Sequence, residues 1–148
     1  MIALANRLAF LASALLVCAA PALAATATGP AVPAFVIDGG TRVTVKGATR
    51  LTMNCDLRNQ GVFTPSAGSV LVLNGYLTPT LTGVTNFADL TIAKQSYVAL
   101  GTNATVSGLL TLTNGRLNLA GHDVIAQNIS GGSAASYVMT PDTLGRLV

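Results

Sequence analysis

Short runs of alternating apolar and polar residues recur along the chain from residue 34 onward and predict β-strands. Each run spans three to five residues, is rich in Val, Ile, Leu and Thr, and is bounded by Gly, Asn or charged residues. The predicted strands are Phe35–Ile37, Arg42–Val45, Arg50–Met53, Ser69–Leu73, Asp89–Ile92 and Gly108–Leu112. No segment in this region has the apolar spacing of a helix, so we expect an all-β fold.

The runs repeat at a spacing near 20 residues. Leu51-Thr-Met-Asn-Cys-Asp-Leu57 aligns with Leu71-Val-Leu-Asn-Gly-Tyr-Leu77, and Leu90 and Leu110 continue the series. One such repeat cannot bury its own apolar side chains, but repeats stacked about 4.8 Å apart pair every strand and close the interior. The pattern therefore predicts a right-handed parallel β-helix of four to five coils, the hand following from the general preference of parallel crossovers.

Three series of apolar positions are expected to fill the interior. The first consists of Leu51, Met53, Leu71, Leu73, Leu90, Ile92, Leu110 and Leu112. The second consists of Leu57, Leu77, Val98, Leu117 and Tyr137, and the third of Val43, Val62, Val84, Val106 and Ile125. An antiparallel sandwich is the competing architecture, because Asn-Gly also makes tight hairpins. The packing of a sandwich, however, does not require a regular repeat near 20 residues, so the repeat favours the β-helix.

Asparagines recur at one position of the repeat and predict a structural corner. Asn54, Asn74 and Asn114 each follow an inward-facing strand. Asn tolerates left-handed backbone and can bond to the equivalent Asn in the next coil, so we expect a ladder there. Cys55 occupies the next position, where other coils have glycine, and is the only cysteine beyond residue 24. It is either a small buried side chain or a thiol that forms an intermolecular link.

The N-terminal segment has the features of a secretory signal peptide. Residues 1–24 contain one positive charge at Arg7, an apolar run, and a small-residue site ending at Ala24. Residues 25–33 are small residues and prolines and predict a flexible lead-in, which leaves residues 34–148 as the β-helix domain. We therefore expect an exported protein whose mature chain has no integral membrane span.

Charge and residue chemistry argue against several classes of function. The net charge is only +3 and the basic residues are spread singly, which favours solvated surface positions over a nucleic-acid site. These residues are Arg42, Lys46, Arg50, Arg58, Lys94, Arg116 and Arg146. The chain has one histidine, His122 beside Asp123, and no Glu, so we expect no metal site, no cofactor and no catalytic site. Asp56 and Arg58 are expected to form a surface ion pair.

Three segments resemble a module of bacterial surface proteins. They are Val84-Thr-Asn-Phe-Ala-Asp-Leu-Thr-Ile92, residues 106–119 with their Leu-Thr-Leu-Thr-Asn-Gly-Arg-Leu motif, and residues 129–140 with their Ser-Tyr-Val-Met-Thr motif. The resemblance covers roughly residues 60–148 and is to adhesin-like, autotransporter-like parallel β-helix proteins of the outer membrane. In that family further coils or an anchoring domain usually follow Ser-Tyr-Val, whereas this sequence ends at Val148.

The resemblance implies a structural and adhesive role at the cell surface, without catalysis. The expected partners are glycans or other surface proteins, and exposed terminal coils are expected to allow self-association. Two alternatives stay open. One is a carbohydrate-active enzyme or carbohydrate-binding module on the same scaffold, and the other is a truncated fragment of a larger adhesin without independent function.

Overall fold

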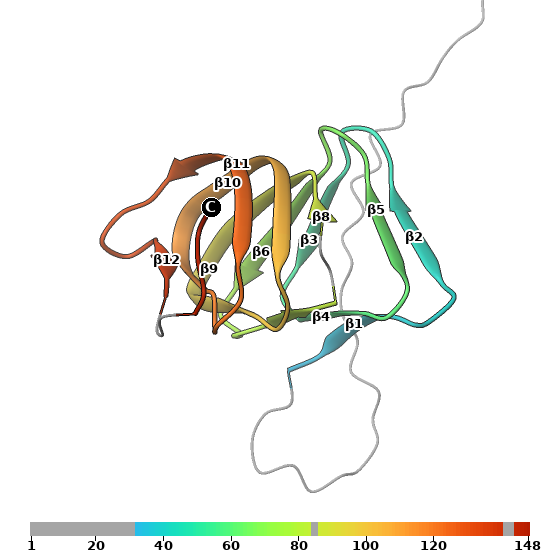
Figure 1. Ribbon diagram of the computed structural model, residues 1–148, viewed down its shortest axis with the longest axis horizontal. Coiled ribbons are helices and arrows are strands. Elements are labelled where there is room, and N and C mark those ends of the chain that lie inside the picture. The colour runs from blue at the N-terminus through green and yellow to red at the C-terminus, as the bar shows by residue number, and fades with distance from the viewer. Residues whose placement is uncertain (1–31, 84–85, 141–143) are drawn as a thin grey trace, which may run out of the picture.

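Parallel β-strands stacked in about five turns form the fold (Figure 1). The computed structural model describes residues 32–83, 86–140 and 144–148, so the predicted signal peptide and most of the lead-in lie outside the described residues. The strands are β1 (Ala34–Ile37), β2 (Arg42–Val45), β3 (Arg50–Met53), β4 (Asp56–Asn59), β5 (Val62–Pro65), β6 (Val70–Gly75), β7 (Thr80–Thr82), β8 (Asn86–Phe87), β9 (Asp89–Leu100), β10 (Ala104–Asn118), β11 (Val124–Gly131) and β12 (Val138–Met139).

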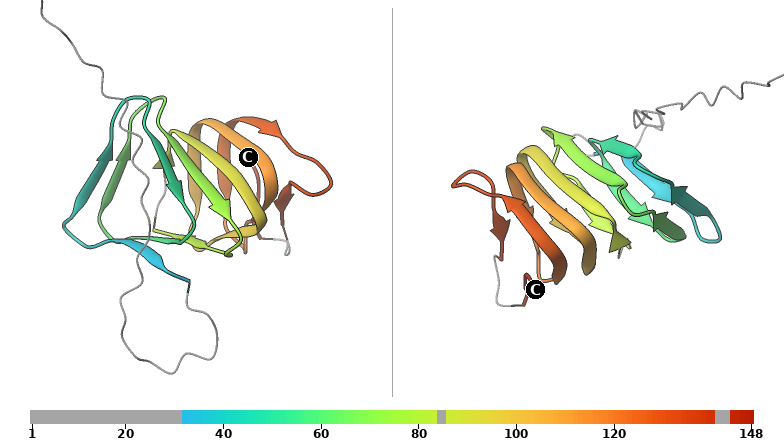
Figure 2. Two further views of the ribbon diagram at one scale, coloured as in Figure 1. Left: turned by 180° about the vertical axis from the view of Figure 1, so that it is seen from behind. Right: turned by 90° about the horizontal axis from the view of Figure 1, so that it is seen from above.

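The strands make up three faces of the solenoid. The first face contains β1, β4, β7, the ends of β9 and β10, and β12. The second contains β3, β6, the start of β9, the middle of β10 and the end of β11. The third contains the β2–β5 pair and β8 with the starts of β10 and β11. The ladders between these strands are all parallel, and Figure 2 shows successive turns side by side. The all-β parallel solenoid is therefore confirmed.

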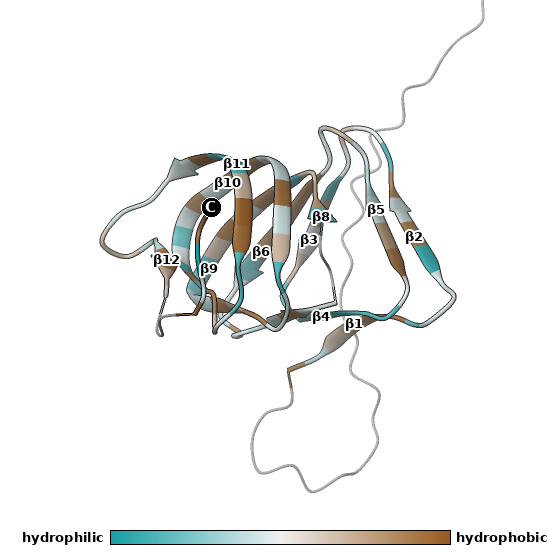
Figure 3. Ribbon diagram, in the orientation of Figure 1, coloured by the Kyte–Doolittle hydropathy of each residue, from teal (hydrophilic) through white to brown (hydrophobic). Residues whose placement is uncertain are grey.

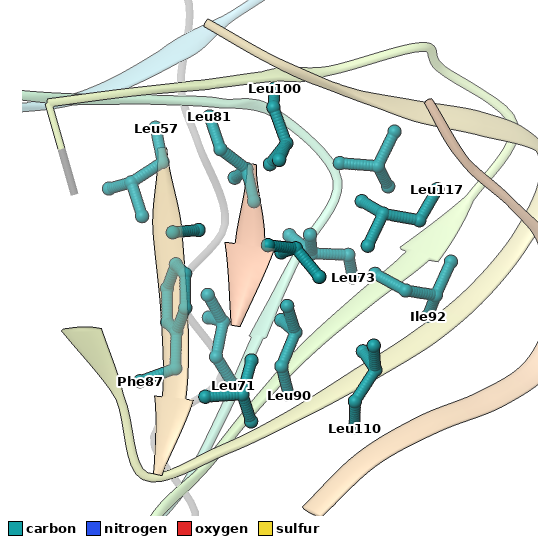
Figure 4. Packing of buried hydrophobic residues seen from close by; sticks show 14 of the residues in the cluster. Leu57, Leu71, Leu73, Leu81, Phe87, Leu90, Ile92, Leu100, Leu110 and Leu117 are labelled. Atoms are coloured by element: carbon teal, nitrogen blue, oxygen red, sulfur yellow. The ribbon is translucent and has the colours of Figure 1, made fainter. Parts of the chain in front are cut away.

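The second face has the register that the repeat predicts. Leu71 pairs with Leu51 on one side and Leu90 on the other, and Leu90 pairs with Leu110. The neighbouring inward positions stack in the same way, as Met53, Leu73, Ile92 and Leu112. Seven of the eight side chains of the first predicted series are buried, and Leu51 is partly buried. Figure 4 shows many of these side chains gathered inside the coil, and Figure 3 shows the apolar bands along the strands.

The second predicted series is wrong at two positions. Leu57 pairs with Leu81 instead of Leu77, because the chain takes extra residues at the corner between β6 and β7. Leu117 pairs with Val98, as predicted, but on its other side with Val138 instead of Tyr137. Tyr137 consequently faces outward and is 40% exposed.

The third predicted series is out of register by one residue in two turns. Val43 pairs with Phe63, so Val62 is exposed. Val106 pairs with Phe87 and Ala126, which leaves Ile125 exposed. A slip of one residue turns a side chain to the opposite face of a strand. The strand register places Phe63 and Phe87 at inward positions of this face, where their rings lie 6.3 Å apart between centroids. The predicted member Val84 lies outside the described residues.

Candidate functional site

The corner that joins the second face to the first varies in length from turn to turn. We call it the variable corner, and it consists of residues 54–55, 74–79, 93–96, 113–115 and 131–137. In register, Ala93 lies beside Asn114 and Tyr97 lies beside Arg116. Three residues, 94–96, therefore stand next to the single residue Gly115 of the following turn. Thr113 in turn has no partner between Ile92 and Ala93, so the corner at residues 113–115 is one residue shorter than the corner at residues 93–96, and we call it the short turn.

Gly115 makes this short turn possible. Its φ is 75°, in the left-handed region that glycine adopts without a Cβ clash. A Cβ at this position would lie 2.4 Å from the backbone oxygen of Lys94 and 2.8 Å from that of Ser96. The two turns can therefore approach this closely only with glycine at residue 115.

An open hollow of about 230 Å³ lies over the short turn. The longer turn borders it on one side and the loop between β11 and β12 on the other. We call it the corner hollow, and it is lined by Gln95, Ser96, Asn114, Arg116, Ala134, Ala135 and Tyr137. These residues come from three successive turns of the solenoid and offer two carboxamides, a hydroxyl, a guanidinium and an aromatic ring.

The loop that forms the outer wall of the hollow is fixed by its own hydrogen bonds. Ser133 and Ser136 exchange two backbone hydrogen bonds of 2.7 and 3.1 Å. The Oγ of Ser133 also accepts a hydrogen bond of 3.2 Å from the backbone N–H of Ala135. At the far end of the loop, Leu117 donates its backbone N–H to the carbonyl oxygen of Tyr137 at 3.0 Å. The wall is thus tied both to itself and to the neighbouring turn.

Arg116 and Tyr137 contact each other in the lining of the hollow. The Cζ atom of Arg116 lies 5.9 Å from the centroid of the Tyr137 ring, which is within the range of a cation–π interaction. The described arginines that form ion pairs are Arg58, with Asp56, and Arg146, with Asp123. Within the described part of the chain, no carboxylate pairs with Arg116.

Lys94 lies behind this surface and is completely buried, which corrects the expectation that it is solvated. Its Nζ donates hydrogen bonds to the Asn54 Oδ1, at 2.7 Å, and to the Asn74 carbonyl oxygen, at 2.5 Å. Lys94 lies beside Gly75 in the strand register, and a Cβ on Gly75 would lie 2.6 Å from the Asn54 carboxamide. The lysine therefore reaches past a glycine to tie together three turns. Burial lowers its pKa from 10.5 to about 8.

The predicted asparagines lie at the variable corner, but their hydrogen bonds differ from those expected. The Oδ1 of Asn54 accepts from Lys94, and that of Asn114 accepts from the backbone N–H of Gly115 at 3.0 Å. No hydrogen bond joins Asn54, Asn74 and Asn114 to one another, all of which are described. The left-handed backbone belongs instead to the glycines that follow, Gly75 and Gly115, since glycine adopts positive φ at the least cost.

The remaining sequence candidates are separate from the hollow. Cys55 is fully buried, and there are no free cysteines in the part of the chain that is described; the intermolecular link at Cys55 stays a prediction. Asp56 and Arg58 form the expected ion pair, with 3.0 Å between Oδ2 and Nη2.

His122 and Asp123 lie side by side in the sequence, but the carboxylate of Asp123 is engaged by Arg146. Arg146 donates to it both its backbone N–H, at 2.9 Å, and its side chain, at 3.2 Å. The hydrogen bond from the Arg146 side chain holds the pKa of Asp123 below its ordinary value. The site candidates predicted from sequence are therefore not brought together, and the corner hollow was not among them.

Comparisons with known proteins give no assignment: no family model, no curated protein and no solved structure matches the chain. Among residues 32–83, 86–140 and 144–148, no three His, Cys, Asp or Glu side chains form a group suited to a metal ion. The same residues contain no helix long and apolar enough to span a bilayer. The corner hollow is therefore the candidate site on geometry alone.

Proposed function

We propose that this protein is an exported, non-catalytic β-solenoid of the cell surface that binds glycans at the corner hollow. The observation that carries the proposal is the lining of the hollow, in which polar side chains surround a partly exposed aromatic ring. Carboxamide, hydroxyl and guanidinium groups exchange hydrogen bonds with sugar hydroxyls. An aromatic ring offers an apolar surface to the C–H face of a sugar.

The scaffold suits this role because strands and a tied loop hold the lining. Asn114 and Arg116 belong to β10, and Gln95 and Ser96 belong to β9. Pairing with neighbouring strands on either side of the corner orders the backbone of both strands, and the Ser96 hydroxyl lies 3.4 Å from the carbonyl oxygens of Tyr76 and Leu77. A pre-ordered site loses less conformational entropy on binding, which favours affinity.

Export and surface location are parts of the proposal that rest on sequence. The signal-peptide features of residues 1–24 and the resemblance to bacterial surface modules support them. Self-association through the terminal coils is a further part. It is supported by the last part of β11, where Asn128–Gly131 pairs with β10 along one edge. Ile129 occupies an inward position there, yet its side chain is 47% exposed.

The alternative of a carbohydrate-active enzyme is less well supported by the hollow. Glycoside hydrolysis ordinarily requires two carboxyl groups flanking the bond that is cleaved. None of the residues that line the hollow is Asp, and the sequence contains no Glu. The lining is therefore better suited to holding a sugar than to cleaving it.

The direct test is glycan-array binding by the purified protein, with Tyr137→Ala as the test variant. Tyr76→Ala is the matched control, since Tyr76 is 71% exposed at the variable corner but does not line the hollow. We expect the protein and Tyr76→Ala to bind the same glycans and Tyr137→Ala to lose most of the signal. Absence of binding to every glycan, or equal binding by the two variants, would contradict the proposal.

A further inference from the structure

We infer that the corner hollow selects acidic glycans and that Arg116 receives the carboxylate of a uronate unit. This inference rests on the proposed glycan-binding function and adds the class of sugar. The hollow is built around a guanidinium that no described carboxylate neutralises, and its polar neighbours are uncharged. A neutral sugar would leave that charge without a partner, whereas a uronate would supply one.

The described arginines differ in their partners, and Arg42, Arg50 and Arg116 form no ion pair with a described carboxylate. Arg58 and Arg146 already hold aspartates, at 3.0 and 3.2 Å, so their guanidinium groups have a partner without ligand. Arg116 is instead placed against the ring of Tyr137. Contact with a ring face leaves the in-plane N–H donors of a guanidinium available, and these donors match the two oxygens of a carboxylate.

The charge of the lining is also positive in sign. Arg116 is the charged residue of the lining, and none of the residues that line the hollow is acidic. The buried amino group of Lys94 is directed to the preceding turns, where it bonds to oxygens of Asn54 and Asn74. An anionic sugar therefore meets attraction from Arg116 and no repulsion from a carboxylate of the lining.

The size and openness of the hollow suit one sugar unit of a longer chain. Pockets that enclose drug-sized ligands measure about 300–1,000 Å³. The corner hollow measures about 230 Å³ and opens to solvent between residues 95–96 and the loop that contains Ala134, Ala135 and Tyr137. Gln95, Ser96 and Asn114 line the same hollow as Arg116, and their carboxamide and hydroxyl groups can exchange hydrogen bonds with sugar hydroxyls. Neighbouring units would continue over the open surface.

The test compares a short oligogalacturonate with its fully methyl-esterified form, which keeps the size and hydroxyls but removes the charge. Binding of each to the purified protein is measured by isothermal titration calorimetry at two salt concentrations. We expect esterification to weaken binding about ten- to a hundred-fold, the range for loss of a hydrogen-bonded charge. Added salt should weaken binding of the acidic form only.

Variants identify the residue. Arg116→Gln should weaken binding of the acidic oligomer to the level of its ester and leave the ester unaffected. Arg50→Gln, at an exposed arginine on β3, should change neither. Circular dichroism of each variant shows that it is folded.

The outcomes separate this inference from the proposed function. Equal affinity for the two forms, or an Arg116→Gln variant that still prefers the acidic form, overturns the inference and leaves glycan binding intact. Binding to neutral glycans of the array but to neither oligomer also overturns the inference and leaves glycan binding intact. Failure to bind any glycan overturns the inference and the proposed function together.

Discussion

The second face and the variable corner of the solenoid follow different rules. On the second face, Leu51, Leu71, Leu90 and Leu110 lie in one register, and their side chains must meet inside the coil. At the variable corner, one turn has four residues, 93–96, where the next has three, 113–115. Apolar burial fixes the spacing of residues that point inward, whereas the length of a solvent-facing corner is free to change. The fold therefore depends on the face, and the candidate site arises at the corner.

The largest expected effect is on the inward series. Leu90→Ala removes a fully buried side chain and should lower the free energy of unfolding by about 2–5 kcal/mol. Thr91→Ala is the control, because Thr91 is the next residue and is only partly buried; its effect should be about 0.5 kcal/mol or less. Urea unfolding of both variants measures the difference. Equal destabilisation would mean that the face does not carry the fold.

A slightly smaller effect is expected where two turns approach at the corner. Gly115→Ala introduces a Cβ close to two backbone oxygens and also strains a left-handed residue. Gly47→Ala strains a residue with φ of 61° but meets no atom within 4 Å. We expect about 1 kcal/mol for Gly47→Ala and at least about twice that for Gly115→Ala, by urea unfolding. Equal destabilisation by Gly115→Ala and Gly47→Ala would contradict the close approach of the Lys94 and Ser96 backbone oxygens to residue 115.

The buried lysine should make stability depend on pH. Its pKa is about 8 in the folded state and 10.5 ordinarily, so between these values the unfolded chain binds more protons. Stability should therefore rise with pH across this window, by about 1–3 kcal/mol for this residue. Below pH 8 Lys94 is charged in the folded state, and burying this charge lowers the free energy of unfolding.

Unfolding of the protein and of Lys94→Met at a series of pH values isolates the contribution of Lys94. The Met variant removes the titrating group, so its stability should lack this rise. Lys46→Met, at an exposed lysine on the first turn, is the control and should keep the pH dependence of the unmodified protein. Parallel pH curves for the protein and Lys94→Met would show that Lys94 is hydrated instead of buried.

The smallest effect on stability is expected inside the hollow. Arg116→Gln removes a contact with Tyr137 worth about 1 kcal/mol or less, and no ion pair with a described residue is lost. Thermal unfolding should therefore place this variant close to the unmodified protein. A large loss of stability would identify Arg116 as a structural residue and weaken its assignment to a site.

The sequence allowed the face to be predicted and the corner to be only partly anticipated. The strands Arg42–Val45 and Arg50–Met53 were predicted with the bounds that the structure has, because alternation and glycine boundaries are local signals. The pairing of Leu57 with Leu81 was missed because it depends on how many residues a solvent-facing corner takes.

Two residues illustrate what local patterns cannot reveal. Lys94 looks like a solvated residue in the sequence, and only stacking past Gly75 shows that it reaches Asn54. A signal was present, since Lys94 stands in the register opposite a glycine. The apolar spacing predicts an inward position for Tyr137, but the loop before it shifts Val138 into that position. The hollow combines residues from three turns, so no single segment of the sequence could predict it.

The most direct test of the site is a nuclear magnetic resonance titration of the labelled protein with oligogalacturonate, following backbone amide shifts. The account predicts shifts concentrated at Gln95, Ser96, Asn114, Arg116 and the loop 132–137, with the outward threonines of the second face unchanged. Shifts centred on Thr52, Thr91 and Thr111 would contradict a glycan site at the corner hollow, and no shifts at high oligogalacturonate concentration would contradict its selection of acidic glycans.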